Sequence, residues 1–440
     1  MRVVDTIYAL SSGRGRAGVA VIRISGPHAG DTVKKLTGGL PVPRQAILRK
    51  LVRASDGSLI DRGLVLWFPG PSSFTGEDVA EFHIHGGLAV IEALLAELSN
   101  QPGLRMAEAG EFTRRAYGHG KYDLTEVEGL ADLIEARTER QRRLAMRQAE
   151  GAASNVLNGW RQQLIRILAR LEAAIDFVDE ADVSEKALEG VGRSISAMAA
   201  EISQEIERGK QGERLRDGIK VVLAGMPNVG KSSLLNCLSR KDAAIVSPVA
   251  GTTRDVVEAH LSLDGMPVIL RDTAGLRSIG SDVIEREGVA RAQSAMGSAD
   301  LVLWVASPDV AGSAAIPDLD SEVLRVWNKA DLAAGPGSGG KDFIAVSSRT
   351  GEGLALLERE LVRRLQSLVA EGESAIVTRQ RHREALTAVL SHLWTAQSDR
   401  PMEIIAEEIR LATYEIGRLT GYVEVETLLD DIFREFCIGK

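Results

Sequence analysis

The strongest constraint on the fold is a glycine-rich loop between an apolar run and a helix-like run. Gly225–Ser232 reads G-x-x-x-x-G-K-S, after the apolar run Ile219–Ala224 and before Ser233–Leu238, whose residues favour a helix. In this strand–loop–helix context the glycines let backbone N–H groups cradle phosphate oxygens, and the helix N-terminus adds positive potential. We expect Lys231 to reach the β- and γ-phosphates of a nucleotide and Ser232 to coordinate Mg²⁺.

The region that follows has the alternation of an α/β domain. Between residues 219 and 368, short apolar runs alternate with helix-like runs, as in a parallel sheet covered by helices. We place this domain at residues 213–370 and expect a Ras-like P-loop fold with a mainly parallel sheet. The predicted strands are Ile219–Ala224, Met266–Arg271, Leu301–Val305, Val323–Trp327 and Phe343–Val346.

A second motif, Asn328-Lys329-Ala330-Asp331, indicates the base that is bound. The Asp331 carboxylate can accept two N–H bonds from guanine, at N1 and the exocyclic amine. Adenine lacks both donors, so the carboxylate would be desolvated without a partner, which is costly. Ser347-Ser348-Arg349 follows the next predicted strand, where a backbone contact to guanine O6 is expected. The domain is therefore predicted to bind GTP and GDP.

Two further motifs complete the set of a GTP-hydrolysing domain. Asp272-Thr273-Ala274-Gly275 ends a predicted strand, and Thr252-Thr253 lies between it and the first loop. We expect Asp272 to hold Mg²⁺ through water, the Gly275 N–H to sense the γ-phosphate, and a threonine hydroxyl to complete the Mg²⁺ shell. Five elements in this order predict a GTPase.

The side chain that orients the attacking water in Ras-like enzymes is missing from its usual position in this sequence. Leu276 occupies the place of their water-orienting glutamine, and leucine cannot orient water. Asn228 is a candidate to help coordinate a monovalent cation, and a turn residue after Pro227 is its alternative. Glu285 is a candidate for positioning the attacking water, and a solvated helix carboxylate is its alternative.

The stretches on either side of this domain have different characters. Residues 1–120 have a mixed α/β pattern, with strands predicted at Val19–Ile24 and Leu64–Phe68 and a helix at Leu88–Leu98. Residues 121–212 and 371–440 have helical periodicity, which predicts one helical domain built from both flanks of an inserted domain. The charged, glycine-containing stretch Arg208–Gly218 is the expected boundary. Apolar residues on the predicted helix faces are Leu157, Trp160, Leu164, Ile167, Leu168, Leu171, Ile175, Ile195, Met198, Ile202, Ile206, Leu428, Leu429, Ile432, Phe433 and Phe436.

Composition limits the class of protein. The 53 basic and 61 acidic residues give a net charge of −8, which excludes a globally basic nucleic-acid coat but not a local patch. One predicted helix carries Arg137, Arg140, Arg142, Arg143 and Arg147, which could meet tRNA phosphates or form a solvated face with its acids. The two cysteines, Cys237 and Cys437, cannot form a disulfide framework, and no long apolar run or secretory leader is evident. A cytoplasmic protein is expected.

Motifs along the whole chain resemble the MnmE (TrmE) family of tRNA-modification GTPases. The segments that carry the resemblance are Asp5-Thr-Ile, Gly13-Arg-Gly, Val21-Ile-Arg-Ile-Ser-Gly26, Phe74-Thr-Gly-Glu-Asp-Val79, His85-Gly-Gly87, Gly110-Glu-Phe-Thr-Arg-Arg-Ala116, Gly120-Lys-Tyr-Asp-Leu124, Gly251-Thr-Thr-Arg-Asp255 and Phe436-Cys-Ile-Gly-Lys440. The terminal Cys-Ile-Gly-Lys is the most specific of them.

The resemblance implies a three-part protein: an N-terminal domain that binds a tetrahydrofolate and dimerises, a helical domain, and an inserted G domain. It implies an FAD-containing partner, MnmG, and modification of C5 of the wobble uridine of certain tRNAs. A 5-formyl- or 5,10-methylene-tetrahydrofolate would supply one carbon. It also implies GTP hydrolysis stimulated by K⁺, with G domains that pair across their nucleotide faces.

Site residues follow from the resemblance position by position. Folate contacts are implied at Arg23, Glu81, Lys121 and Lys440, Mg²⁺ ligands at Ser232 and Thr253, and K⁺ ligands at Asn228, Ser247, Val249 and Thr252. The full set of implied nucleotide contacts is Asn228, Val229, Gly230, Lys231, Ser232, Ser233, Ser247, Pro248, Val249, Ala250, Gly251, Thr252, Thr253, Asp272, Thr273, Ala274, Gly275, Asn328, Lys329, Asp331, Ser347, Ser348 and Arg349.

Three assignments keep alternatives. Glu285 matches the switch-II glutamate of the family, with Glu287 as a rival. Cys437 matches the family's C-terminal cysteine near the folate, with a catalytic role or a buried structural one. His83 has no role in the resemblance, and a metal ligand is not expected from a histidine pair on a strand.

Other classes also fit parts of the sequence. A GTPase that acts as a switch on the ribosome would share the G-domain motifs, without the N-terminal segments or the terminal Cys-Ile-Gly-Lys. A folate-dependent one-carbon enzyme for a small substrate would leave the GTPase motifs without a purpose. Binding of folate by the chain is the first test between these classes.

Overall fold

The chain forms two compact units, of residues Met1–Ala131 with Gly417–Lys440 and of Asp132–Ile416. The computed structural model describes residues 5–13, 15–176, 188–241, 258–272, 293–319, 321–332, 342–398, 400–422, 429, 432–433, 436 and 438–440. The predicted fold class, multidomain α/β with a P-loop domain, is confirmed. Across the described part of the chain, none of the helices is long and apolar enough to cross a membrane.

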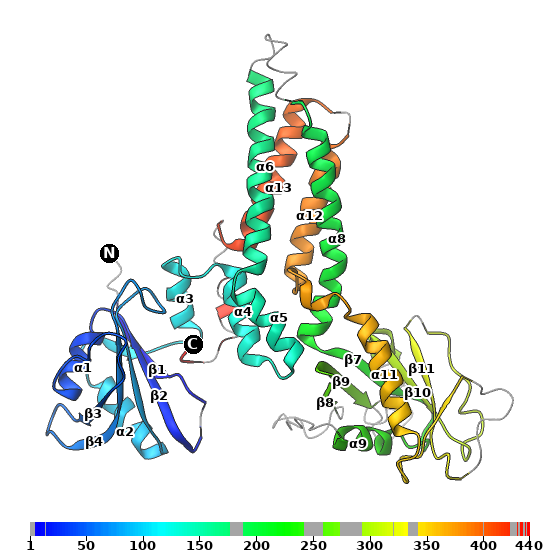
Figure 1. The fold of residues 1–440 in the computed structure, drawn as a ribbon, viewed down its shortest axis with the longest axis horizontal. Helices are drawn as coiled ribbons and strands as arrows, with labels where there is room; N and C mark the ends of the chain where they lie inside the picture. Colours follow the sequence, from blue (N-terminus) through cyan, green and yellow to red (C-terminus); the bar gives the residue numbers. More distant parts are fainter. Residues whose placement is uncertain are drawn as a thin grey trace, which may run out of the picture. The chain divides into compact units, whose positions relative to one another are not determined.

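The first unit is built on a six-stranded mixed sheet (Figure 1). Its strand order is β3-β4-β5-β2-β1-β6, antiparallel except for the parallel pair β1–β6. The strands are β1 Thr6–Leu10, β2 Ala17–Ser25, β3 Ile47–Val52, β4 Leu59–Phe68, β5 Val79–Gly86 and β6 Leu104–Met106. Strands predicted at 19–24 and 64–68 are confirmed within β2 and β4, and the helix predicted at 88–98 is α2, Leu88–Ser99.

Alternation along β2 divides its residues between the two faces of this sheet. Ile22 and Ile24 are fully buried in the core under α1 (Ala29–Thr37) and α2. Because side chains alternate along a strand, Arg23 points to the opposite face. There α3 (Glu111–Gly118) brings Phe112 against Ile7 and Ala9 of β1 in a second, smaller core. Arg23 is therefore placed on a face that α3 partly covers.

The last residues of the chain pack within the same unit. Phe433 and Phe436 are buried against Leu124 and Val127, two residues of α4 (Leu124–Glu135). Ile438 then forms an antiparallel bridge with Ala109, just before α3. The terminal segment is thus held on the N-terminal unit by an apolar cluster and by backbone pairing.

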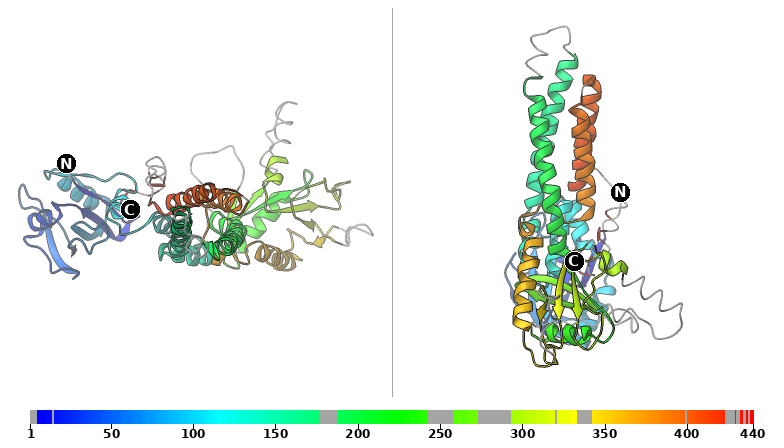
Figure 2. Two further views of the ribbon diagram at one scale, coloured as in Figure 1. Left: turned by 90° about the horizontal axis from the view of Figure 1, so that it is seen from above. Right: turned by 90° about the vertical axis from the view of Figure 1, so that its right-hand side faces the viewer.

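The second unit contains a bundle of long helices. The helices are α5 Glu139–Ala149, α6 Ala152–Asp176, α8 Val191–Asp217, α12 Gln380–Ala396 and α13 Met402–Thr420, and the last four run side by side (Figures 1 and 2). Ion pairs and hydrogen bonds join neighbours, as between His392 Nδ1 and Glu408 Oε2 at 2.7 Å. The predicted apolar stripe is buried at Leu157, Trp160, Leu164, Ile167 and Leu171. Helices from the two predicted flanks, such as α8 and α12, therefore pack together.

The same unit contains a second six-stranded sheet, of order β12-β11-β10-β7-β9-β8. Its pairs are parallel except β8–β9. The elements are β7 Ile219–Ala224, α9 Lys231–Lys241, β8 Glu258–Leu263, β9 Met266–Asp272, β10 Leu301–Ala306, β11 Val323–Trp327, β12 Ile344–Ala345 and α11 Leu354–Leu368. The five predicted strands are confirmed within a residue or two, and β8 was not predicted. Carboxyl ends of parallel strands share one edge, where α/β sheets bind ligands.

The chain passes twice between the helical bundle and the second sheet, and the two connecting segments are hydrogen-bonded to each other. The stretch 208–218, predicted to hold a domain boundary, forms the last turns of α8, which ends at Asp217. It packs against the returning segment at 372–378, and a Cβ added to Gly212 would lie 2.8 Å from Ala375 Cβ. Glu205 of α8, 7% exposed, accepts the N–H groups of Ile376 (2.7 Å) and Val377 (3.4 Å) through Oε1. Burial raises the pKa of Glu205 above its usual value.

Substitutions at Glu205 test this fastening. Glu205→Ala leaves two buried N–H groups without their acceptor and is expected to lower the free energy of unfolding by about 1–3 kcal/mol. Glu205→Gln keeps a carbonyl acceptor. Because the pKa is raised on folding, this carboxyl group contributes stability below the unfolded pKa that is lost as pH rises through the folded pKa. Relative to wild type, the glutamine variant should therefore gain stability as the pH rises.

Chemical denaturation of the three proteins at a series of pH values measures both effects. Equal destabilisation by alanine and glutamine at every pH would contradict the assignment of the carbonyl oxygen as the N–H acceptor.

Candidate functional site

Backbone geometry of the loop after β7 requires glycine at two positions. Gly225 has a φ of 139°, and a Cβ there would lie 2.2 Å from the carbonyl oxygen of Val305. Gly230 has a φ of 93°, and a Cβ there would lie 2.3 Å from Asn328 Nδ2. Both contacts are closer than non-bonded atoms allow. The glycines of the motif thus let the loop pack tightly against the strands beside it.

Lys231, at the start of α9, has its ammonium group inside the curve of this loop. Nζ donates to the carbonyl oxygens of Gly225 and Met226, both at 3.0 Å, and the side chain is 5% exposed. The next residue, Ser232, donates from Oγ to Oδ2 of Asp272 at 2.6 Å. Asp272 ends β9 and is 2% exposed. A hydroxyl and a buried carboxylate side by side offer the hard oxygen ligands that suit Mg²⁺.

Two adjacent side chains after β11 hold three consecutive carbonyl groups of the loop. Asn328 Nδ2 donates to the oxygen of Val229 at 2.9 Å and lies 3.4 Å from that of Gly230. Lys329 Nζ donates to the oxygen of Asn228 at 2.6 Å. Asn228 has a φ of 65°, a left-handed conformation that is unfavourable without support. The motif predicted to read the base therefore also fixes the loop predicted to bind phosphate.

Asn328 also organises the loop after β12. Its Oδ1 accepts from the Ser348 N–H at 3.1 Å and from the Ser348 hydroxyl at 2.9 Å. Ser347, fully buried, donates from Oγ to Oδ1 of Asp331 at 2.6 Å. Asp331 and Arg349, which follows these serines, are both exposed. The sequence motifs predict that these residues contact one nucleotide, and the structure places them around one edge of the sheet.

Asp309 and Cys237 also contact residues at this edge of the sheet, which the sequence did not predict. Asp309 Oδ2 accepts from Lys329 Nζ at 2.6 Å, and this hydrogen bond from Lys329 lowers the pKa of Asp309. Cys237, predicted as a core residue, is half-buried on α9 and lies with Sγ 3.1 Å from the carbonyl oxygen of Ser348. No motif marks Asp309, because its role depends on where β10 ends in space.

Some predicted residues fall in segments that the structure does not describe. They are Ser247, Pro248, Val249, Ala250, Gly251, Thr252, Thr253, Thr273, Ala274, Gly275, Glu285 and Cys437. Ser233 is described, and it is exposed on the first turn of α9.

In the N-terminal unit the structure brings together Arg23 and Glu81, as the resemblance implies. Arg23 donates from Nε (3.0 Å) and Nη2 (2.9 Å) to Glu81 Oε1, and the two side chains are 16% and 17% exposed. The guanidinium group lies 5.1 Å from the ring centre of Phe74 and 5.7 Å from that of Phe112. Burial raises the pKa of Glu81, but the charge of Arg23 and the hydrogen bonds to the carboxylate outweigh it, so the pKa is lowered.

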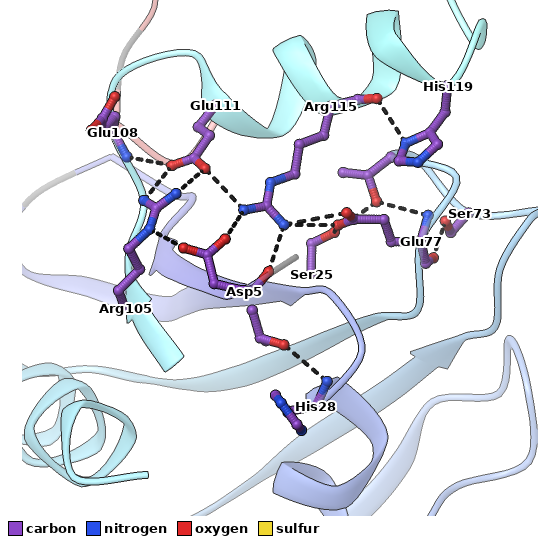
Figure 3. A network of polar contacts seen from close by, with 12 residues as sticks. Asp5, Ser25, His28, Ser73, Glu77, Arg105, Glu108, Glu111, Arg115 and His119 are labelled. Atoms are coloured by element: carbon purple, nitrogen blue, oxygen red, sulfur yellow. Dashed lines mark hydrogen bonds and ion pairs between the residues drawn. The ribbon is translucent and has the colours of Figure 1, made fainter. Parts of the chain in front are cut away.

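A network of charged groups fixes α3 and hence Phe112 against Arg23 (Figure 3). Arg115 of α3 donates to both oxygens of Glu77 at 3.2 Å and to Oδ1 of Asp5 at 2.8 Å. Arg105 of β6 donates to Oδ2 of the same Asp5 at 2.5 Å. The network ties one helix to the start of β1 and to the loop before β5. These charged residues hold α3 in place, and with it the ring of Phe112 beside Arg23.

Lys121 and Lys440 lie in the same unit. The Lys121 side chain passes beside Gly76, where an added Cβ would lie 3.4 Å from Lys121 Cε. The ring of the next residue, Tyr122, lies tilted by 50° against that of Phe74, with ring centres 5.8 Å apart, so Lys121 is adjacent to an aromatic ring that lies over Arg23. Lys440 follows Gly439, whose backbone packs against the carbonyl oxygen of Leu10 at the end of β1.

The arginine stripe of α5 is largely paired. Arg142 and Arg143 bond to Glu139 at 2.8 and 3.0 Å. Arg140 lies 3.6 Å from Asp264 and 3.5 Å from Glu373. These pairs reduce the positive potential of the helix face, which favours the reading of a solvated face.

Comparison with known proteins gives matches over the whole chain. A family model described as the MnmE helical domain matches residues 124–437, and one described as the GTP-binding protein TrmE N-terminus matches residues 6–121. A relative from Methylobacterium sp. (strain 4-46), named tRNA modification GTPase MnmE, is 50% identical over 100% of both chains. A relative of the same name from Parvibaculum lavamentivorans is 49% identical over 99% of this chain and 100% of its own.

A solved structure also matches the inserted domain. The G domain of the T. maritima FeoB iron transporter is 29% identical and covers 34% of this chain and 99% of its own. Its TM-score of 0.25 is too low to support an argument.

Base recognition by Asp331 can be tested with one substitution. Asp331→Asn places an amide donor where the carboxylate accepted from guanine, and xanthine has a carbonyl group at that position. GDP affinity should fall on the order of 10³-fold, while affinity for xanthosine diphosphate should rise. Isothermal titration with the two nucleotides measures the exchange.

Asp342→Asn is the matched control, since Asp342 is exposed and pairs only at the surface with Arg325. Retention of guanine preference by the Asp331→Asn protein would contradict the assignment.

Proposed function

The chain belongs to the MnmE family of tRNA modification GTPases, and on this premise we propose that it modifies C5 of the wobble uridine of certain tRNAs. The chain is a GTP hydrolase of that family. The observation that carries the proposal is that one chain holds both a hydrogen-bonded edge around Asn328, where guanine reading is expected, and a half-buried Arg23–Glu81 pair beside aromatic rings. A switch protein for the ribosome would have no use for the second site.

GTP is held by the loop after β7 through backbone N–H groups and Lys231, with Asp331 reading the guanine. Ser232 and Thr253 are the proposed Mg²⁺ ligands, with Asp272 holding Ser232. Mg²⁺, when bound, offsets the negative charge that develops on the phosphates. The chain's own contribution is to hold the phosphates in line and to fix the ligand hydroxyl beside a buried carboxylate.

Hydrolysis needs a positive charge and a positioned water that Leu276 cannot provide. We assign K⁺ to Asn228, Ser247, Val249 and Thr252, at the place where other GTPases receive an arginine. The supporting observation is the exposed, left-handed Asn228, whose carbonyl oxygen Lys329 holds in place. Glu285 positions the water in this proposal, and pairing of two G domains completes the site.

The folate site is proposed at Arg23, Glu81, Lys121 and Lys440. The Glu81 carboxylate suits the N–H donors of a pterin ring, and the lysines suit the glutamate carboxylates of the ligand. The rings of Phe74 and Phe112 beside Arg23 support a flat aromatic ligand. The folate supplies one carbon for the uridine, and Cys437 is the proposed catalytic thiol near it.

Partners follow from the same proposal. The chain acts as a homodimer through its N-terminal domain, with the FAD-containing protein MnmG, on tRNA in the cytoplasm. Movement of the G domains during GTP hydrolysis drives the cycle.

The dependence of GTP hydrolysis on the monovalent cation can be measured directly. Single-turnover GTP hydrolysis should be faster in KCl than in NaCl at equal ionic strength, by about 10-fold or more, because K⁺ supplies transition-state charge. Asn228→Ala should remove the difference between the salts while GDP still binds. Rates that are equally slow in both salts for the wild-type chain would contradict cation-assisted hydrolysis.

Substitution of Glu81 tests the proposed folate site. Glu81→Gln should weaken binding of 5-formyltetrahydrofolate by about 10- to 100-fold, because a charged hydrogen-bond acceptor is lost. Isothermal titration of the full chain measures this. Asp56→Asn is the control, since Asp56 is an exposed carboxylate in the turn between β3 and β4. Wild-type affinity in the Glu81→Gln protein would place the ligand elsewhere.

A further inference from the structure

His83 lies beside the Arg23–Glu81 pair and has no assigned role. It follows Glu81 by two residues on β5, so both side chains point to the same face of the sheet. His83 Nε2 is 3.2 Å from Glu81 Oε2, whereas both bonds from Arg23 reach the other oxygen, Oε1. The carboxylate of Glu81 is therefore held at both of its oxygens, by different partners.

The protonation of this contact follows from the charges around it. The pKa of Glu81 is lowered, so its carboxylate is ionised and only accepts hydrogen bonds. His83 must then carry a proton on Nε2 to make the contact. The residues opposite His83 in the sheet are Val21 on β2 and Leu64 on β4, both apolar. Glu81 is thus the polar partner towards which the ring is turned.

We propose that His83 is a positioning residue of the folate site, which fixes the Glu81 carboxylate for the ligand. The inference rests on the proposed folate site. A terminal carboxylate turns easily about its last bond, because that torsion has broad preferences. A bond to one oxygen from Arg23 leaves this freedom, and a second bond to the other oxygen removes it. Fixing the group before binding lowers the entropy cost of binding.

The arrangement also indicates which ligand atoms Glu81 receives. An ionised carboxylate has about four acceptor sites. Arg23 fills two at Oε1 and His83 fills one at Oε2. Among the residues that the structure describes, the site left open is at Oε2, so an N–H donor of the ligand meets that oxygen, beside the histidine ring.

His85 shows that this role is specific to one histidine. It lies two residues further along the same face, but its Nδ1 is 2.8 Å from Asp61 Oδ1. Its side chain is 71% exposed, compared with 29% for His83. His85 therefore provides a matched control: a histidine paired with a carboxylate on the same strand, outside the Arg23–Glu81 pair.

The test is titration of 5-formyltetrahydrofolate into the full chain and its variants. His83→Leu removes the donor at similar size and should weaken binding about tenfold. His83→Gln keeps an N–H donor at comparable reach and should bind within about threefold of wild type. His85→Gln should bind like wild type. Thermal unfolding of each variant verifies that it is folded.

A double-mutant cycle separates positioning from general damage. If His83 acts through Glu81, adding His83→Leu to the Glu81→Gln protein should cause no further loss of affinity. An additive loss, or a glutamine variant as weak as the leucine variant, would overturn the proposal, and so would wild-type affinity in His83→Leu. Absence of folate binding by the wild-type chain would instead remove the folate site itself, and this inference with it.

Discussion

The nucleotide site depends on one set of hydrogen bonds, in which two neighbouring side chains hold three neighbouring carbonyl groups. Asn328 and Lys329 bond to the carbonyl oxygens of Asn228, Val229 and Gly230. These bonds support a left-handed residue whose conformation costs on the order of 1–3 kcal/mol. Asn328 and Lys329 belong to the predicted base-reading motif and hold the predicted phosphate-binding loop, so a change at either residue is expected to disturb both.

The proposed folate site is built by the same physical means. Two of its ionised groups, Arg23 and Glu81, are paired with each other, so that the ligand meets groups already fixed in direction. Arg23 is held between two rings and bonded to Glu81, while Arg115 anchors the helix that carries one of those rings. Arg23 and Glu81 lie on strands and Lys231 begins a helix, and such elements position side chains more exactly than loops do.

The parts that could be predicted from sequence are those whose chemistry is local. The loop Gly225–Ser232 requires its glycines and its flanking strand, so β7 and the phosphate site follow from the residues themselves. The contact of His83 with Glu81, and that of Asp309 with Lys329, depend on strand register or on where separate strands end, which spacing along the chain does not show. The charge and glycines of the stretch 208–218 predict a domain boundary, but they do not show that Gly209 and Gly212 allow close packing of α8 against the returning chain.

We propose that this one chain couples a folate site in its N-terminal unit to a GTPase site in its second unit for the modification of tRNA. The most direct test incubates the purified chain with MnmG, tRNA, GTP, K⁺, a nitrogen donor and tetrahydrofolate labelled in its one-carbon unit. The account predicts label at C5 of the wobble uridine, and loss of that label when GTP is omitted or Lys231→Ala is used. Label that appears equally without GTP, or tRNA that stays unlabelled while GTP is hydrolysed, would contradict it.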